Sequence, residues 1–198
     1  MQHRPEEAAW IKEARNGDDR SFGYLVESYQ APVYNLCYRM LGTPGDAEDA
    51  AQETFLKAYR NLKRYDPQRS FTNWLLSIAS HHCIDRLRRR RIQWLSLEGD
   101  TVGPISEPGL SPEGNAVVRE KQAAVQAMLK ELSPTDRSAV VLKYWYDMSY
   151  EEIAETLSLT ESAVKSRLHR ARRELAQRMV AAEPAAAIGG LRDEASAI

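Results

Sequence analysis

Residues 149–168 read SYEEIAETLSLTESAVKSRL, the pattern of two short amphipathic helices joined by a tight turn. Ser149 and Glu152 have the spacing of a capping box, so a helix is predicted to begin directly after the serine. Ser158-Leu159 makes the turn, and Thr160 caps the second helix. The residues predicted to face inward are Ile153, Ala154, Leu157, Val164, Leu168 and Ala171. This arrangement is a helix-turn-helix, whose second helix enters the major groove of DNA.

The outer face of the second predicted helix carries the groups that reading DNA requires. Donors near the start of such a helix meet base edges, and neighbouring cations hold phosphates. Lys165, Ser166 and His169 are placed for bases. Arg167, Arg170 and Arg173 are placed for the phosphate backbone or for the helix packing. The candidate DNA-binding residues of this helix are Ser162, Lys165, Ser166, His169, Arg170 and Arg173.

The net charge of −1 hides two strongly basic blocks. Residues 57–91 hold ten basic residues against two acidic ones, and residues 165–178 hold six against one. Two separate basic blocks in a nearly neutral chain predict two contacts with a polyanion. The alternative is that each block is a solvated helix face, because charge runs are common on exposed helices.

The chain before residue 93 has helical rather than alternating periodicity. Breaks fall at the turn signal Gly42-Thr43-Pro44-Gly45 and at Asp66-Pro67. The apolar stripes between and beside these breaks predict four helices packed as an antiparallel bundle. These stripes lie within residues 22–29, 33–40, 55–62 and 74–87.

A change of composition separates two domains. Residues 93–115 are rich in Pro, Gly, Ser and Glu and have no sustained apolar period, which predicts a linker. The helical pattern then returns, and Ser133-Pro134-Thr135-Asp136 opens a helix with a serine cap. The chain is therefore predicted to be all-α, with two small helical domains joined by a flexible linker, the C-terminal one a helix-turn-helix. The predicted bounds are 1–92 for the first domain, 93–115 for the linker, 116–182 for the second domain and 183–198 for a disordered tail.

Composition also argues against several classes of protein. The longest uncharged apolar stretch, residues 70–84, contains Asn73 and two histidines and is too short and polar to cross a bilayer. Charges interrupt the N-terminus where a secretory signal would need an apolar segment, so we expect no membrane insertion and a cytoplasmic location. Cys37 and Cys83 lie in apolar helical segments, and we expect buried, free thiols.

With these features in view, the chain resembles the extracytoplasmic-function sigma factors, group IV of the sigma-70 family, over roughly residues 18 to 180. The resemblance implies a sigma factor that binds core RNA polymerase and directs promoter recognition and transcription initiation, in a stress- or envelope-related regulon. Whether an anti-sigma factor also binds stays open. The motifs that carry the resemblance, specific in combination and order, are DAEDAAQETFLKAY at residues 46–59, FTNWL at 71–75 followed by Ile78-Ala79, YEEIA at 150–154, and VKSRLHRAR at 164–172.

The resemblance assigns the helix over residues 46–59 to the clamp of the polymerase largest subunit, and the second domain to the −35 element and the polymerase flap. The helix over residues 46–59 carries, at helical spacing, Asp49, Gln52, Glu53 and Leu56. An acidic and amide stripe of this kind can meet a basic partner helix, although it could also be a solvated face. No histidine, nucleophile or glycine-rich loop stands near the carboxylates, so neither a catalytic site nor a cofactor is predicted.

The resemblance assigns the fourth helix and the loop before it to reading and melting the −10 element. Melting calls for aromatic or amide groups against an extruded base and for cations on the displaced strand. The run over residues 86–91 circles its helix and predicts phosphate contacts that add affinity and salt dependence. Phe71 could equally belong to the core, where Trp74 is expected. The candidate residues for the −10 element are Arg64, Tyr65, Arg69, Ser70, Phe71, Asn73, His81, Arg88 and Arg89.

Three alternative interpretations fit parts of the sequence. His81-His82-Cys83 could suggest zinc, but neighbouring residues on a helix point in different directions, so no metal site is predicted. A one-component helix-turn-helix regulator would bind DNA without polymerase, but it leaves the helix over residues 46–59 unexplained. An enzyme acting on nucleic acid would need metal ligands or a nucleophile in a constellation that the sequence lacks.

Overall fold

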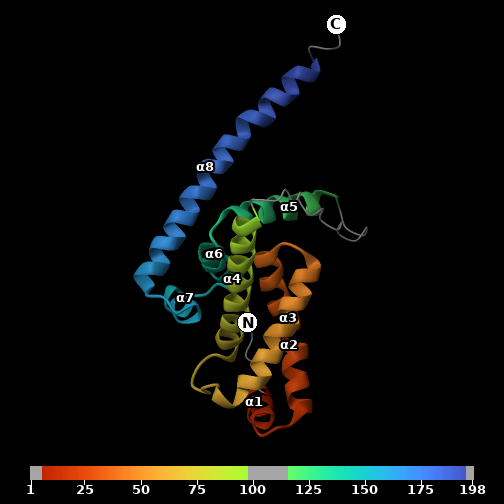
Figure 1. Ribbon diagram of the computed structural model, residues 1–198, viewed down its shortest axis with the longest axis vertical. Helices are drawn as coiled ribbons and strands as arrows, with labels where there is room; N and C mark the ends of the chain where they lie inside the picture. The colour runs from red at the N-terminus through yellow and green to blue at the C-terminus, as the bar shows by residue number, and fades with distance from the viewer. Residues whose placement is uncertain (1–5, 98–115, 195–198) are drawn as a thin grey trace.

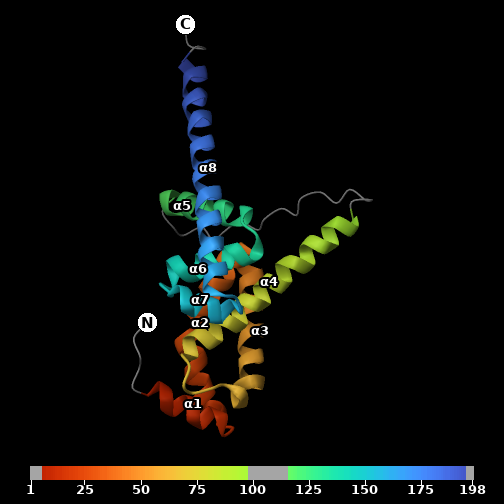
Figure 2. The same cartoon turned by 90° about the vertical axis from the view of Figure 1, so that its left-hand side faces the viewer.

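Helices make up every regular element in the described part of the chain. The computed structural model describes residues 6–97 and 116–194 (Figures 1 and 2). The predicted all-α class with two helical units is confirmed; we call α1 to α4 the N-terminal unit and α5 to α8 the C-terminal unit. The elements are α1 (Glu7–Arg15), α2 (Asp19–Leu41), α3 (Pro44–Asn61), the short 3-10 helix η1 (Leu62–Arg64), α4 (Phe71–Leu97), α5 (Ala116–Glu131), α6 (Pro134–Trp145), α7 (Tyr150–Leu157) and α8 (Glu161–Glu194).

The helices of the N-terminal unit begin and end at local sequence signals. The Asp18 carboxylate accepts a hydrogen bond from the Ser21 amide at 2.8 Å and so caps the start of α2. Gly42 ends α2 in the left-handed region, with φ of 88°, and Thr43 then caps α3. The predicted turn is therefore the junction between α2 and α3.

Helix α2 is longer than the separate apolar stripes indicate. The stripes at residues 22–29 and 33–40 lie on one continuous helix that passes through Pro32. Leu25 and Met40, near its two ends, are both buried, so the packing of one long face outweighs the backbone hydrogen bond that proline removes. The short helix α1, which no stripe indicates, packs against α2.

The helix starts predicted for the C-terminal unit are confirmed. Ser133 caps α6, and Ser149 with Glu152 makes both hydrogen bonds of the capping box at the start of α7. Ser158 turns the chain with φ of 54°, and Thr160 caps α8 by accepting a backbone hydrogen bond at 3.2 Å. Helices α7 and α8 thus form the predicted helix-turn-helix.

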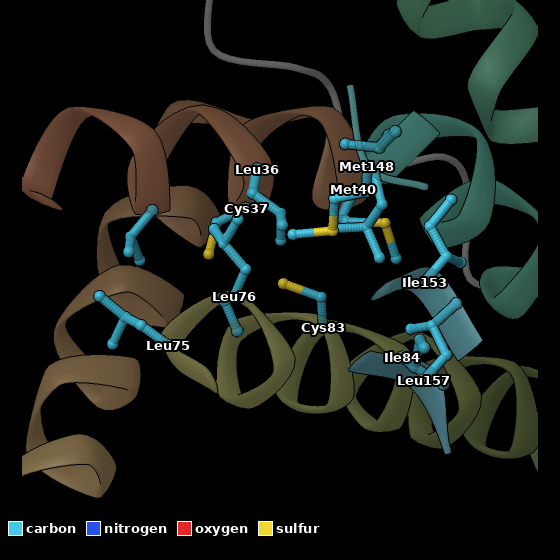
Figure 3. Packing of buried hydrophobic residues seen from close by; sticks show 14 of the residues in the cluster. Leu36, Cys37, Met40, Leu75, Leu76, Cys83, Ile84, Met148, Ile153 and Leu157 are labelled. Carbon is cyan, nitrogen blue, oxygen red and sulfur yellow. The ribbon is translucent and has the colours of Figure 1, made fainter. Parts of the chain in front are cut away.

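The two units share one hydrophobic core, and we call their contact the seam (Figure 3). Helix α7 packs against α4, and α6 packs against both α2 and α4. Cys37 and Cys83 are buried and free, as predicted. The units therefore lie against each other rather than apart. The buried residues that meet near the seam include Met40, Cys83, Ile84, Met148, Ile153 and Leu157.

Two helices extend beyond the predicted domain bounds. Helix α4 runs to Leu97, into the predicted linker, whose remaining residues 98–115 lie outside the described residues. Helix α8 runs to Glu194 and projects from the body of the molecule (Figures 1 and 2). Residues 183–194, predicted as disordered, are thus helical, and alanine, the best helix former, occurs five times between residues 181 and 187.

Candidate nucleic-acid and polymerase interface

The outer face of α8 presents the predicted −35 residues to solvent. Val164 and Leu168 on the inner face are at most 2% exposed, and their burial sets the rotation of the helix. Lys165 remains exposed, 3.5 Å from Glu161 and 5.7 Å from the ring centroid of Tyr150. All six predicted residues are exposed: Ser162, Lys165, Ser166, His169, Arg170 and Arg173.

Asp136, at the start of α6, binds two arginines of α8, the partly buried Arg167 and the exposed Arg170. Its carboxylate accepts hydrogen bonds from Ser133 Oγ at 2.7 Å, from Arg167 at 2.8 Å and from Arg170 at 3.4 Å. Burial opposes ionisation of Asp136, but the hydrogen bonds from Ser133 and Arg167 outweigh it and lower the pKa of the carboxyl. Arg167 therefore fixes α8 on α6.

The loop between η1 and α4 rests on a cluster of aromatic rings. Tyr65 and Phe71 are 4% and 3% exposed, and their rings meet edge to face with centroids 5.4 Å apart. Trp74 is half-buried against both, and the Tyr65 hydroxyl donates to the Arg69 carbonyl. Tyr65 and Phe71, predicted as walls for an extruded base, thus lie inside the protein, because burial under the loop removes their apolar surface from water.

The other −10 candidates divide by exposure. Asn73 is half-buried and donates from Nδ2 to Glu152 Oε1 of α7 at 3.0 Å. Within the basic run of α4, Arg86 and Arg90 each donate to Asp46 of α3 at 2.5 Å. The run is therefore divided between contacts inside the fold and exposed cations. The exposed candidates are Arg64, Arg69, Ser70, His81, Arg88 and Arg89.

The side chains of His81-His82-Cys83 have three different surroundings. His81 Nδ1 lies 2.8 Å from the Ser77 carbonyl, His82 Nδ1 lies 2.9 Å from Lys57 Nζ, and Cys83 is in the core. Among residues 6–97 and 116–194, no three histidine, cysteine or acidic side chains come together as metal ligands.

Helix α3 carries an exposed stripe beside an apolar groove. Leu56 is 48% exposed and Tyr59 is 44% exposed, so α3 presents apolar surface to solvent. Together with Phe22 and Val26 of α2, they line a groove of about 580 Å³. The sequence did not reveal this groove, because the four-residue spacing of Phe22 and Val26 is also that of a core stripe. The predicted stripe residues Asp49, Gln52, Glu53 and Leu56 are all exposed.

Comparison with known proteins identifies the family. The model of Sigma-70 region 2 matches residues 25–92, and that of Sigma-70, region 4 matches residues 122–175. The ECF RNA polymerase sigma factor SigW of Bacillus subtilis is 36% identical over 177 residues, which cover 85% of this chain and 94% of the relative. The chain belongs to the ECF sigma factors. These proteins are transcription initiation factors.

Other relatives agree with this assignment. RNA polymerase sigma factor CnrH of Cupriavidus metallidurans is 32% identical over 182 residues, covering 86% of this chain and 94% of the relative. The structure of CnrH in complex with the cytosolic domain of CnrY matches with a TM-score of 0.66 and 27% identity, over 88% of this chain and 97% of that chain. The sigma factor RpoE from Bartonella quintana, co-crystallised with the anti-sigma factor NepR, shares the fold at a TM-score of 0.63 and 20% identity, over 80% and 96% of the two chains.

As a sigma factor, the chain binds core RNA polymerase and directs it to promoters. A one-component regulator is not favoured, because region 2 of the family is matched as well as the helix-turn-helix region. Among the described residues, no helix has the length and apolar character needed to cross a membrane.

Proposed function

We propose that three surfaces of this sigma factor divide the work of initiation. The exposed stripe of α3, with the adjoining groove, binds the clamp of the polymerase largest subunit. Helix α4 and the loop before it read and melt the −10 element, and the C-terminal unit reads the −35 element and contacts the flap. The exposed stripe and groove carry the proposal, because a helix-turn-helix alone would serve equally well in a regulator that never meets polymerase.

At the −10 element, exposed cations hold phosphates and polar side chains meet unpaired bases. Tyr65 and Phe71 support the loop from beneath rather than stacking on a base. Asn73 becomes available to a base once its hydrogen bond to Glu152 is broken. The residues proposed for this contact are Arg64, Arg69, Ser70, Asn73, His81, Arg88 and Arg89.

At the −35 element, the first turns of α8 enter the major groove. Lys165, Ser166 and His169 are exposed on the side opposite the buried inner face, and we assign them to base edges. Ser162, Arg170 and Arg173 flank them, and we assign these three to phosphates.

The same proposal extends to location and regulation. A factor that works through polymerase acts in the cytoplasm, carries out no reaction of its own and needs no cofactor. RpoE was solved in complex with the anti-sigma factor NepR, and CnrH in complex with the cytosolic domain of CnrY. We therefore include an anti-sigma factor among the partners of this chain.

Charge reversal on α3 tests the proposal. Asp49→Lys with Glu53→Lys places like charges across the interface, which costs several kcal/mol for close pairs. We expect the double variant to lose co-purification with core polymerase while its helical content by circular dichroism is retained. The matched control is Asp85→Lys with Glu120→Lys, an equal charge change at exposed positions outside α3, which should still co-purify. Co-purification of the α3 variant at the parent level would remove this helix from the interface.

A further inference from the structure

A buried carboxyl group of α1 lies close to the start of α4. Glu7 is 8% exposed and accepts a hydrogen bond from the Tyr29 hydroxyl of α2 at 2.8 Å. The same hydroxyl oxygen lies 3.0 Å from Oγ1 of Thr72, in the first turn of α4. These side chains therefore join three helices at one point, although α1 lies outside residues 25–92, which match region 2 of the family.

The chemistry of the three groups sets the direction of this hydrogen-bond chain. A tyrosine hydroxyl carries one proton, and burial raises the pKa of Tyr29 to about 12, so the hydroxyl stays protonated. Because Tyr29 donates that proton to Glu7, its contact with Thr72 requires the threonine hydroxyl to donate to Tyr29. The start of α4 is therefore linked through Tyr29 to a buried acceptor on α1.

Helix α1 also contacts the chain before the loop that leads into α4. Arg15 Nη2 donates to the Lys63 carbonyl of η1 at 3.5 Å. This bond is exposed and long, so the buried contact at Thr72 is the stronger of the two. Beside it, the rings of Tyr29 and Phe71 meet edge to face with centroids 5.4 Å apart. The loop is thus attached to the same scaffold before its first residue and after its last.

We propose that Glu7 and Tyr29 are positioning residues for the −10 element, which hold the start of α4 and the loop before it in the conformation that meets DNA. The inference rests on the proposed DNA-binding role of this loop. Order in the free protein removes an entropic cost that would otherwise oppose binding. Both residues are at most 8% exposed, so they act through the loop rather than by touching DNA.

Removal of the Tyr29 hydroxyl tests this role in the complex with core polymerase. Tyr29→Phe retains the ring that packs on Phe71. It should lower the affinity for a promoter with a matched −10 element roughly threefold to tenfold, the factor that corresponds to one hydrogen bond. Affinity for the same promoter with a scrambled −10 element should stay at the parent level. The matched control is Tyr146→Phe, which removes another hydrogen-bonded, half-buried hydroxyl and should change neither affinity.

Further variants separate positioning from a general loss of stability. Thr72→Val keeps the shape of threonine without its hydroxyl, and it should have the same effect as Tyr29→Phe. Because both changes interrupt one hydrogen-bond chain, the double variant should lose no more affinity than either single variant. Glu7→Gln keeps an acceptor for the Tyr29 hydroxyl, so it should distinguish the matched from the scrambled −10 element as the parent does.

Three results would overturn the positioning role. The first is an equal loss of affinity for the matched and the scrambled promoter in Tyr29→Phe, which would point to destabilisation of the whole protein. The second is a parent-level affinity of Tyr29→Phe for the matched promoter, and the third is losses that add in the double variant. A parent protein that does not distinguish the two promoters would instead contradict the proposed function of the loop itself.

Discussion

Two helices begin with the same sequence pattern, which is Thr43-Pro44-Gly45-Asp46 at α3 and Ser133-Pro134-Thr135-Asp136 at α6. Each aspartate forms ion pairs with two arginines of a basic helix far along the chain. In both, the cap hydroxyl donates to the aspartate carboxylate, at 2.6 Å from Thr43 and 2.7 Å from Ser133. We call these two clusters the Asp46 node and the Asp136 node.

The two nodes differ in how tightly they hold their arginines. Arg86 and Arg90 are four residues apart and both lie 2.5 Å from Asp46. Arg167 lies 2.8 Å from Asp136, whereas the side chain of Arg170 is 60% exposed and lies at 3.4 Å. A basic block is therefore not uniform: its tightly paired arginines stabilise the fold, and its exposed cations, among them the loosely held Arg170, are available to DNA.

We expect the largest effect on promoter recognition from Lys165, which belongs to neither node. Lys165→Ala should weaken discrimination for the −35 element by about 1–3 kcal/mol, the usual value of a good base contact. Arg167→Ala, its matched control in the Asp136 node, should lower stability and leave discrimination unchanged. Binding of the polymerase complex to matched and scrambled −35 sequences measures both, and an equal loss on the two sequences for Lys165→Ala would remove it from base reading.

Removing the charge of the central aspartate should destabilise the protein more at the Asp46 node than at the Asp136 node. Asp→Asn keeps the cap geometry and removes the charge that the arginines bind. Because hydrogen bonds to charged groups contribute about 1.5–3 kcal/mol, we expect a loss of about 2.5 kcal/mol for Asp46→Asn and about 1.5 kcal/mol for Asp136→Asn in urea unfolding. Asp85→Asn, at an exposed position, serves as the control and should be neutral. A larger loss at Asp136 would reverse the ranking that the distances indicate.

Local features of these regions could be predicted from the sequence, and long-range ones could not. The capping box at Ser149 and the inner face of the helix-turn-helix depend on residues a few positions apart, so the pattern alone defines them. The Asp46 node joins residues forty positions apart, and the seam joins Met40 to Arg137. The local pattern left Phe71 open between the core and a base contact, and it did not indicate that the two units would share a core.

A smaller, pH-dependent effect should distinguish the two basic blocks. Burial, and then the charges of Lys57 and Arg86, lower the pKa of His82 in the N-terminal block. As the pH falls, His82 is therefore protonated in the unfolded chain before it is protonated in the folded protein, and this favours unfolding. Stability is full above the ordinary pKa of 6.5 and falls as the pH drops from there towards the lower folded pKa.

Urea unfolding at about pH 7.5 and about pH 5.5 measures this effect. We expect the parent protein to be less stable at the lower pH, and His82→Asn to lose less stability between the two, because its side chain does not titrate. His169→Asn, at an exposed position of the C-terminal block, should behave as the parent. An undiminished loss in His82→Asn would assign the pH dependence to other groups.

The division of each basic block into fold and DNA contacts is tested most directly by the salt dependence of promoter binding. Each phosphate contact contributes about 0.9 to the slope of log K against log salt concentration. With the polymerase complex on one promoter, Arg89→Ala should lower the magnitude of this slope by about one, whereas Arg86→Ala, paired with Asp46, should leave it unchanged while lowering thermal stability. Equal reductions of the slope in both variants would contradict this division of the basic block.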